Sequence, residues 1–440
     1  MAITREQLQA DAVRAFLQNK SLIVNWGTGV GKSRVAVEAV RRLIPSKERI
    51  LLLVSETAHK ANWRREFIDA LGETEGCELF GALVVECHAS LHKYENTAWD
   101  VIIIDEGHHL RSERRTGLLS TITSEYVLVL TATLSEDGDA DNLVQTLDRT
   151  FKPFEGKYFS VQDAIDNAIL GEPKIFVHYL PLRAIKAVQT IVFEWGMKDR
   201  RVEIECDVKN FELFAGKPKR YPHVRLTMHG TAAECYDFLS SKVEFFKKQY
   251  LRSRESAGLR EGEEPDGFTA VLRDRMNLAA VKRKRLLGQA KTTFARWLLA
   301  QPALNGKKLV CFCSDVDQAE ALGGENAISA RRNDCETVIA RFNADAIRTI
   351  FAVDMIKEGS NLKGIQAGVV IQLGGKERDF IQKFGRVFRC GQPEQHIIVI
   401  GGTRDEYYLD KALAGIRPEY VHKIDWGARM GLSENRSSLR

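Results

Sequence analysis

The sequence predicts an α/β protein made of two parallel-sheet lobes with an accessory segment between them. Three observations predict this class. Short apolar runs alternate with helical patterns near both ends of the 440-residue chain, which is typical of parallel sheets covered by helices. The middle of the chain lacks this alternation. At about 150 residues per domain the length allows three units, which we place at 1–150, 151–300 and 301–440.

The first unit contains five apolar runs with the length of buried strands: Leu22–Trp26, Ile50–Val54, Leu83–Cys87, Val101–Ile104 and Tyr126–Leu130. The spacing of apolar residues between them predicts helices at Arg34–Ile44, Ala58–Ala70 and Thr116–Thr123. Because strands alternate with helices, neighbouring strands are expected to run parallel.

The last unit repeats this rhythm. Its predicted strands are Leu309–Cys313, Thr349–Val353, Val369–Leu373 and Ile397–Ile400. Its predicted helices are Asp315–Leu322, Glu336–Phe342 and Arg378–Phe388. The two units share no sequence repeat, so the sequence predicts two separate α/β lobes.

The middle unit is rich in charged and aromatic residues. Thr231–Leu251 and Phe268–Leu299 are expected to form long, basic, amphipathic helices, joined by a loop at Arg252–Gly267. The run Lys282–Arg285 is compatible with contact to a phosphate backbone and equally with a solvated helix face. Its aromatic residues, Phe245 and Trp297 among them, could stack on bases, but we favour core positions for them.

The composition excludes a disordered or fibrous chain, because 44% of the residues are hydrophobic and 28% are charged. No apolar run reaches the roughly 18 residues of a membrane span, and no signal-peptide core is present. We expect a soluble cytoplasmic protein (in the host cytoplasm if the source is viral) without a membrane partner. The eight cysteines form no C-x-x-C pair, so neither a structural zinc site nor a disulfide framework is expected.

A glycine-rich loop follows the first predicted strand and leads into a predicted helix. It consists of Trp26, Gly27, Thr28, Gly29, Val30, Gly31, Lys32 and Ser33. In this context glycines let backbone N–H groups surround phosphate oxygens, and the helix N-terminus adds partial positive charge. We expect Lys32 to reach the β- and γ-phosphates of ATP and the Ser33 hydroxyl to bind Mg²⁺. Trp26 replaces the usual first glycine of the pattern.

Two adjacent acids, Asp105 and Glu106, follow the buried strand Val101–Ile104. Functional groups gather at the carboxyl ends of parallel strands, and two neighbouring carboxylates need a cation to offset their repulsion. We expect Asp105 to hold Mg²⁺ through water. Glu106 is expected to orient or deprotonate the attacking water.

These residues resemble the superfamily 2 helicases and translocases. Asp105-Glu106-Gly107-His108 is similar to their DEAH-type box, and Thr131-Ala132-Thr133 to their third motif. The resemblance implies that Thr131 and Thr133 link hydrolysis to the grip on nucleic acid and that His108 helps to couple the two lobes. Gln9 resembles the family's adenine-reading glutamine. Gln7 is a rival for that role, and a polar helix face is an equally simple explanation of the segment.

The last unit extends the resemblance. Residues 351–362, which include Asp354 and Gly359, resemble motif V, and residues 382–389, Gln382 to Arg389, fit the Q-x-x-G-R-x-x-R pattern of motif VI. Arg386 and Arg389 lie three residues apart and so share one helix face. A forked guanidinium suits the charge that develops on a transferring γ-phosphoryl group. The resemblance thus implies two RecA-like lobes with ATP in the cleft between them, bound in part by Gly359 and Gln382.

Within the superfamily the signals are mixed. The segments 105–112 and 385–392 resemble Snf2-type translocases, whereas the length and the Thr-Ala-Thr motif are closer to the small phage-type branch-migration and annealing helicases. The resemblance implies an ATP- and magnesium-dependent DNA helicase or translocase, acting on single-stranded, forked or branched DNA as a monomer or weak oligomer. An RNA helicase and a non-catalytic nucleic-acid-binding scaffold remain open as alternatives.

Overall fold

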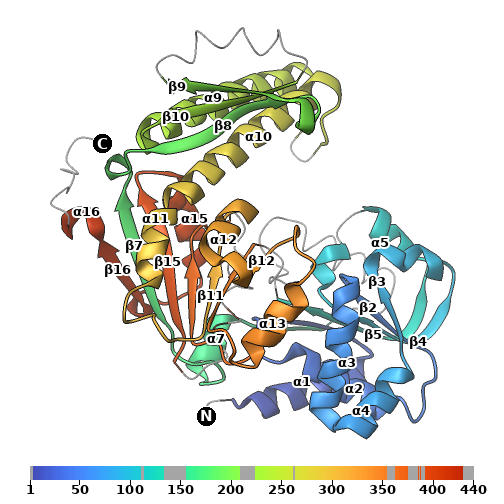
Figure 1. The fold of residues 1–440 in the computed structure, drawn as a ribbon. Helices are drawn as coiled ribbons and strands as arrows, with labels where there is room; N and C mark the ends of the chain where they lie inside the picture. Colours follow the sequence, from blue (N-terminus) through green and yellow to red (C-terminus); the bar gives the residue numbers. More distant parts are fainter. Residues whose placement is uncertain are drawn as a thin grey trace.

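The computed structural model describes residues 3–110, 113–132, 155–208, 223–260, 263–353, 362–374, 385, 387 and 392–429. They form two α/β lobes and a projecting arm (Figure 1). Every strand pair within the two large sheets is parallel. The predicted fold class, two parallel-sheet lobes with an accessory part, is therefore confirmed.

The first lobe has a six-stranded sheet in the order β3-β2-β4-β5-β1-β6. Its strands are β1 (Ser21–Trp26), β2 (Ile50–Val54), β3 (Val84–Cys87), β4 (Ala98–Ile104), β5 (Thr123–Thr131) and β6 (Glu155–Phe159). Its helices are α1 (Arg5–Asn19), α2 (Lys32–Leu43), α3 (Thr57–Leu71), α4 (Glu73–Gly81), α5 (Glu113–Leu119) and α7 (Val161–Asp166). The central strands are fully buried, as a sheet covered on both faces requires.

The second lobe has a seven-stranded sheet in the order β12-β13-β11-β14-β15-β7-β16. Its strands are β7 (Lys174–Pro181), β11 (Leu309–Phe312), β12 (Ala327–Ile328), β13 (Thr349–Ala352), β14 (Ala367–Val370), β15 (Glu394–Gly401) and β16 (Val421–Asp425). Its helices are α11 (Thr292–Leu299), α12 (Val316–Gly323), α13 (Cys335–Asn343), α15 (Arg404–Leu413) and α16 (Trp426–Arg429). Cys311 and Cys313 are buried core residues here, without a disulfide.

Sheet membership does not coincide with the limits predicted at residues 150 and 300. Strand β6 lies in the first sheet, and β7 lies in the second sheet between β15 and β16. The chain crosses to the second lobe through α7 and adds β7 there before it forms the arm. Two side chains of α7 contact Arg417 of the second lobe. The backbone N of Arg417 donates to Gln162 Oε1 (3.1 Å), and its guanidinium forms an ion pair with Asp166.

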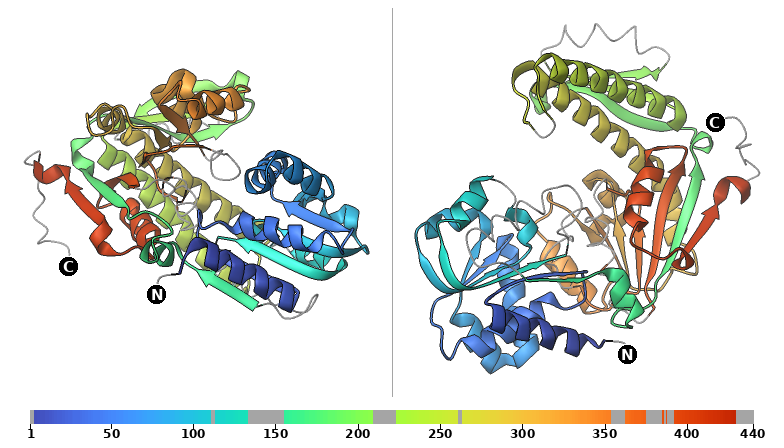
Figure 2. Two further views of the ribbon diagram at one scale, coloured as in Figure 1. Left: turned by 90° about the horizontal axis from the view of Figure 1, so that it is seen from below. Right: turned by 180° about the vertical axis from the view of Figure 1, so that it is seen from behind.

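We call residues 188–290 the arm. It pairs a three-stranded sheet, β8 (Val188–Trp195), β10 (Val224–Gly230) and β9 (Val202–Asp207), with the long helices α9 (Ala232–Ser256) and α10 (Gly267–Ala290). Figures 1 and 2 show it extending from the second lobe. The single helix predicted at Phe268–Leu299 is two helices, because α10 ends at Ala290 and α11 begins at Thr292. Helix α9 continues to Ser256, beyond its predicted end.

The residue between α10 and α11, Lys291, anchors the arm to the second lobe. Its side chain is fully buried, and Nζ lies 2.6 Å from Asp405 Oδ2 and 3.0 Å from both Ile371 O and Gln372 Oε1. Three acceptors match the three N–H donors of an ammonium group. The arm is thereby fixed to the ends of strands in the second sheet by a buried, hydrogen-bonded ion pair.

A row of hydrogen bonds crosses the second sheet near its β16 edge. Trp426 Nε1 donates to His178 Nδ1 (3.2 Å), His178 Nε2 lies 2.9 Å from His396 Nδ1, and His396 Nε2 lies 2.8 Å from Glu394 Oε1. All three hydrogen bonds of this row form when each imidazole is neutral and carries its proton on Nε2. Burial, together with His396 and Arg429, lowers the pKa of His178 to about 3.

This row makes stability depend on pH. His178 is neutral in the folded state but takes up a proton near pH 6.5 when unfolded, so its contribution is full above that pH and declines as the pH falls. Between pH 7.5 and 5.5 the loss is on the order of 1 kcal/mol. We expect the free energy of unfolding in urea to fall less between these two pH values in His178→Phe than in the wild-type protein. Equal decreases in both proteins would contradict the assignment.

In the part of the chain that the structure describes, no helix is both long and apolar enough to cross a membrane.

Candidate functional site

The glycine-rich loop connects β1 to α2 as predicted. Gly29 and Gly31 have φ angles of 90° and 104°, in the left-handed region that favours glycine. Lys32, the first residue of α2, donates from Nζ to the carbonyl of Trp26 (2.9 Å). This bond closes the loop on itself. Ser33 follows in the first turn of the same helix.

Gln9 lies against this loop. Its Nε2 donates to the carbonyls of Val30 (3.4 Å) and Gly31 (3.3 Å), and a Cβ on Gly31 would stand only 2.2 Å from that nitrogen. Gln7 instead belongs to the capping box of α1, where its Oε1 accepts from the backbone N of Thr4 (2.9 Å). Of the two glutamines, Gln9 is therefore the one at the loop. Its role toward adenine remains a prediction.

Asp105 and Glu106 lie at the carboxyl end of β4, on the same edge of the parallel sheet as the end of β1 at which the loop begins, with β5 between the two strands. Glu106 has a φ of 48°, a left-handed conformation that non-glycine residues adopt at some energetic cost and that is enriched at functional sites. Asp105 Oδ1 accepts from the backbone N of Glu106 (3.0 Å). Asp105 Oδ2 accepts from the indole N–H of Trp63 on α3 (2.8 Å). Trp63 is not among the predicted site residues.

His108 connects the acids to the end of β5. Its Nδ1 lies 3.3 Å from Glu106 Oε2 and 3.2 Å from Thr131 Oγ1, and the ring is buried. The predicted residues Glu106, His108 and Thr131 thus form one contact chain. His88 is a second buried histidine in this part of the lobe, and burial, with His109 and Arg115 nearby, lowers its pKa to about 3.

The second lobe reaches the loop through Gly385. A Cβ on Gly385 would lie 2.4 Å from Thr28 Cβ and 3.1 Å from the Thr28 carbonyl oxygen, so the two residues are in direct contact. Val387 is buried and packs on Gly368 of β14, which joins this segment to the second sheet. Six predicted site residues lie outside the described residues: Thr133, Asp354, Gly359, Gln382, Arg386 and Arg389.

Comparisons with known proteins agree with this arrangement. A family model described as "Type III restriction enzyme, res subunit" matches residues 3–136, which contain the loop and both acids. The DNA 3'-5' translocase XPB2 of Sulfurisphaera tokodaii is 23% identical over 414 residues, which cover 90% of this chain and 82% of that protein. Both matches support a helicase or translocase of superfamily 2.

Among solved structures, the helicase domain of Pyrococcus furiosus Hef aligns with 92% of this chain. The alignment covers 96% of that domain, with 13% sequence identity and a TM-score of 0.45.

The basic run in the arm, Lys282–Arg285, is largely engaged in packing. Lys282 Nζ donates to the carbonyl of Val192 (2.9 Å), and burial lowers its pKa to about 8. Arg283 donates to Ser240 Oγ (3.4 Å), while Arg285 is exposed. Both predicted interpretations of the run, a phosphate contact and a solvated helix face, therefore fit Arg285 better than they fit Lys282.

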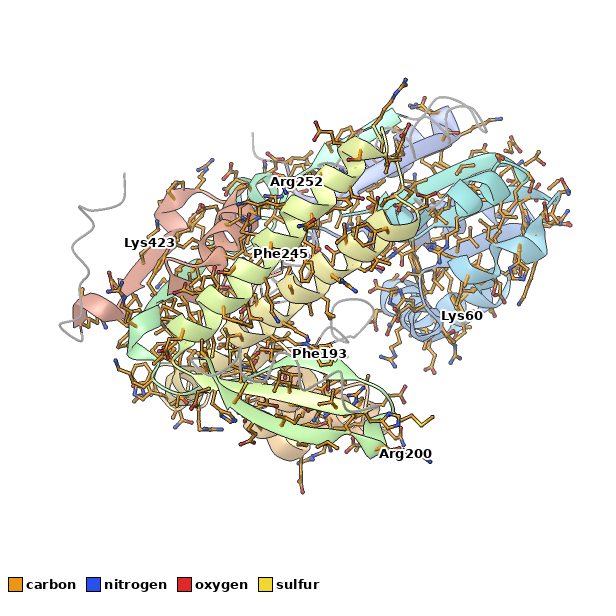
Figure 3. The ribbon with its side chains drawn as sticks, turned by 90° about the horizontal axis from the view of Figure 1, so that it is seen from above. Lys60, Phe193, Arg200, Phe245, Arg252 and Lys423 are labelled. Atoms are coloured by element: carbon orange, nitrogen blue, oxygen red, sulfur yellow. The ribbon has the colours of Figure 1, made fainter. Side chains whose placement is uncertain are left out.

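The preference for core positions is wrong for two aromatic side chains. Phe245 on α9 is 58% exposed, and Trp297 on α11 is 42% exposed. Figure 3 shows Phe245 and Arg252 along α9. The helical spacing of α9 puts Phe245 on the face that its sheet does not cover, which the apolar pattern alone does not reveal.

Proposed function

We propose that this chain is an ATP-dependent DNA translocase or helicase that hydrolyses ATP between its two lobes. The contact of Gly385 with Thr28 supports the proposal, because Gly385 lies against the phosphate-binding loop and is the residue before Arg386 in the sequence. The printed name of the XPB2 relative, a DNA 3'-5' translocase, supports DNA as the partner. The substrate we propose is single-stranded, forked or branched DNA.

Loop residues 27–33 bind ATP. Backbone N–H groups and Lys32 hold the phosphates, in a turn whose glycines permit close approach. We assign recognition of the adenine edge to Gln9, which lies beside Gly31. Ser33 and Asp105 would hold Mg²⁺, and their hydroxyl and carboxylate oxygens are the donors that this ion prefers. When bound, the ion neutralises charge on the β- and γ-phosphates.

In hydrolysis, Glu106 orients the attacking water and accepts its proton. Arg386 and Arg389 offset the negative charge that develops on the γ-phosphoryl group. Because these arginines belong to the second lobe, turnover requires that lobe to stand against the loop. Through the contact chain from Glu106 to His108 and Thr131, a change at the bound nucleotide can affect the end of β5.

Movement along DNA follows if lobe closure alternates with opening, since each state presents different strand contacts. Thr133 and Asp354 are the residues we assign to these contacts beside His108 and Thr131. A scaffold without activity fits the chain less well, because every residue assigned to hydrolysis is present in the sequence.

The test compares ATP hydrolysis with single-stranded, forked and duplex DNA and with RNA of the same sequence. We expect single-stranded or forked DNA to raise the rate several-fold more than RNA does. Lys32→Ala should lower the stimulated rate by about 10²-fold, since it removes a charge that contacts the transferring phosphate. Stronger stimulation by RNA, or an unchanged rate in Lys32→Ala, would contradict the proposal.

A further inference from the structure

Trp63 is a buried side chain next to the acid that we assign to magnesium. It lies on α3, seven residues into the helix, and is 4% exposed. Its ring packs near Phe67, with centroids 6.4 Å apart, which places the apolar part of the indole in the core of the first lobe. The indole N–H needs an acceptor once buried. That acceptor is Asp105 Oδ2, at 2.8 Å.

The two oxygens of Asp105 are held from two directions. Oδ1 accepts from the backbone N of Glu106, the next residue in the chain (3.0 Å), and Oδ2 accepts from Trp63, 42 residues away on another element. The terminal torsion of an aspartate is broad and roughly two-fold. A donor on each oxygen therefore fixes the plane of the carboxylate, and the Trp63 bond is the one that relies on tertiary packing.

Helix α3 is itself fixed at the carboxyl edge of the sheet. Ser55 Oγ, just after β2, lies 2.9 Å from His59 Nδ1 on α3. Lys60 pairs with Glu86 of β3 at 3.3 Å. The same stretch of α3 thus contacts the ends of β2, β3 and β4, and the indole of Trp63 is a rigid part of the site's surroundings.

We propose that Trp63 is a positioning residue for the Mg²⁺-binding carboxylate of Asp105. The inference rests on the proposed function, because it takes the assignment of Asp105 to Mg²⁺ from there. Trp63 does not contact the reacting atoms. It orients the carboxylate, and the loss of such a supporting hydrogen bond typically weakens metal affinity 10- to 100-fold.

The experiment measures binding of a non-hydrolysable ATP analogue while Mg²⁺ is titrated. Trp63→Phe keeps an aromatic ring but removes the donor. A second variant carries benzothienylalanine at position 63, which keeps the shape of the indole and lacks only the N–H. In both we expect the half-saturating Mg²⁺ concentration to rise about ten-fold, while the melting temperature of the benzothienylalanine protein without Mg²⁺ changes little.

The matched control is Trp99→Phe in the same lobe. Trp99 is also buried, and its indole donates to Thr97 Oγ1 (2.9 Å), far along β4 from the acids. This variant should keep the wild-type Mg²⁺ dependence. An unchanged half-saturating concentration in the benzothienylalanine protein would overturn the role of Trp63 while leaving the proposed function intact. Absence of Mg²⁺-dependent nucleotide binding in the unmodified chain would overturn both.

Discussion

Gly385→Ala is expected to lower ATP hydrolysis by about 10²-fold while nucleotide still binds to the first lobe. The added Cβ would stand 2.4 Å from Thr28 Cβ, a separation that van der Waals radii forbid, and Thr28 cannot rotate its Cβ away. The lobes would have to separate at this point. A misplacement of about 1 Å in catalytic groups costs on the order of 10²-fold in rate.

Gly415→Ala is the matched control for this change. It adds the same methyl group to the second lobe at a position where nothing lies within 4 Å, and we expect it to keep the wild-type rate. The rates are measured at saturating ATP and DNA, and nucleotide binding is measured separately. Wild-type turnover in Gly385→Ala would show that the contact with Thr28 does not belong to the active arrangement.

Glu106→Gln is expected to retain ATP binding and to lose turnover by about 10²- to 10⁴-fold, the usual contribution of a general base. The amide has nearly the shape of the carboxylate but cannot accept a proton from water. Single-turnover hydrolysis and equilibrium binding of ATP separate the two effects.

Glu125→Gln makes the same chemical change elsewhere in the first lobe, at a partly exposed residue that pairs with Lys20 and Lys47. It should leave turnover unaffected. If Glu106→Gln hydrolysed ATP at the wild-type rate, Glu106 would lose its assigned role.

Much of the first lobe could be predicted because its information is local. Strand β2, Ile50–Val54, is a continuous apolar run bounded by polar residues, and the loop before Lys32 carries its glycines where the backbone needs left-handed angles. The order and spacing of these motifs also placed Asp105 and Glu106 at a strand end. The fold class followed from the same alternation of strands and helices.

What the sequence did not reveal depends on contacts between distant residues. Strand β7 joins the second sheet through pairing with β15, more than 200 residues later, and no local pattern records that choice. Strand β8 was missed for the same reason, since its partner is β10 in the arm. Lys291 separates α10 from α11 within an otherwise continuous helical pattern, and it pairs with Asp405, more than 100 residues later.

The candidate site shows the same division. Lys32, Asp105 and Glu106 could be found from motif chemistry, whereas Trp63 was not among the predicted site residues. Only the fold reveals that its N–H points at Asp105. The sequence does show a tryptophan in the helix after the second strand. Its role can be inferred only when the position of Asp105 relative to that helix is known.

Hydrolysis between the lobes requires that one nucleotide is bound by both of them. A crystal structure with ADP, Mg²⁺ and a planar mimic of the transferring phosphate, in the presence of single-stranded DNA, measures this most directly. We expect the mimic to lie beside Lys32, with the guanidinium of Arg386 or Arg389 within hydrogen-bonding distance of it. A fully bound nucleotide that touches first-lobe residues alone, with both arginines turned to solvent, would contradict it.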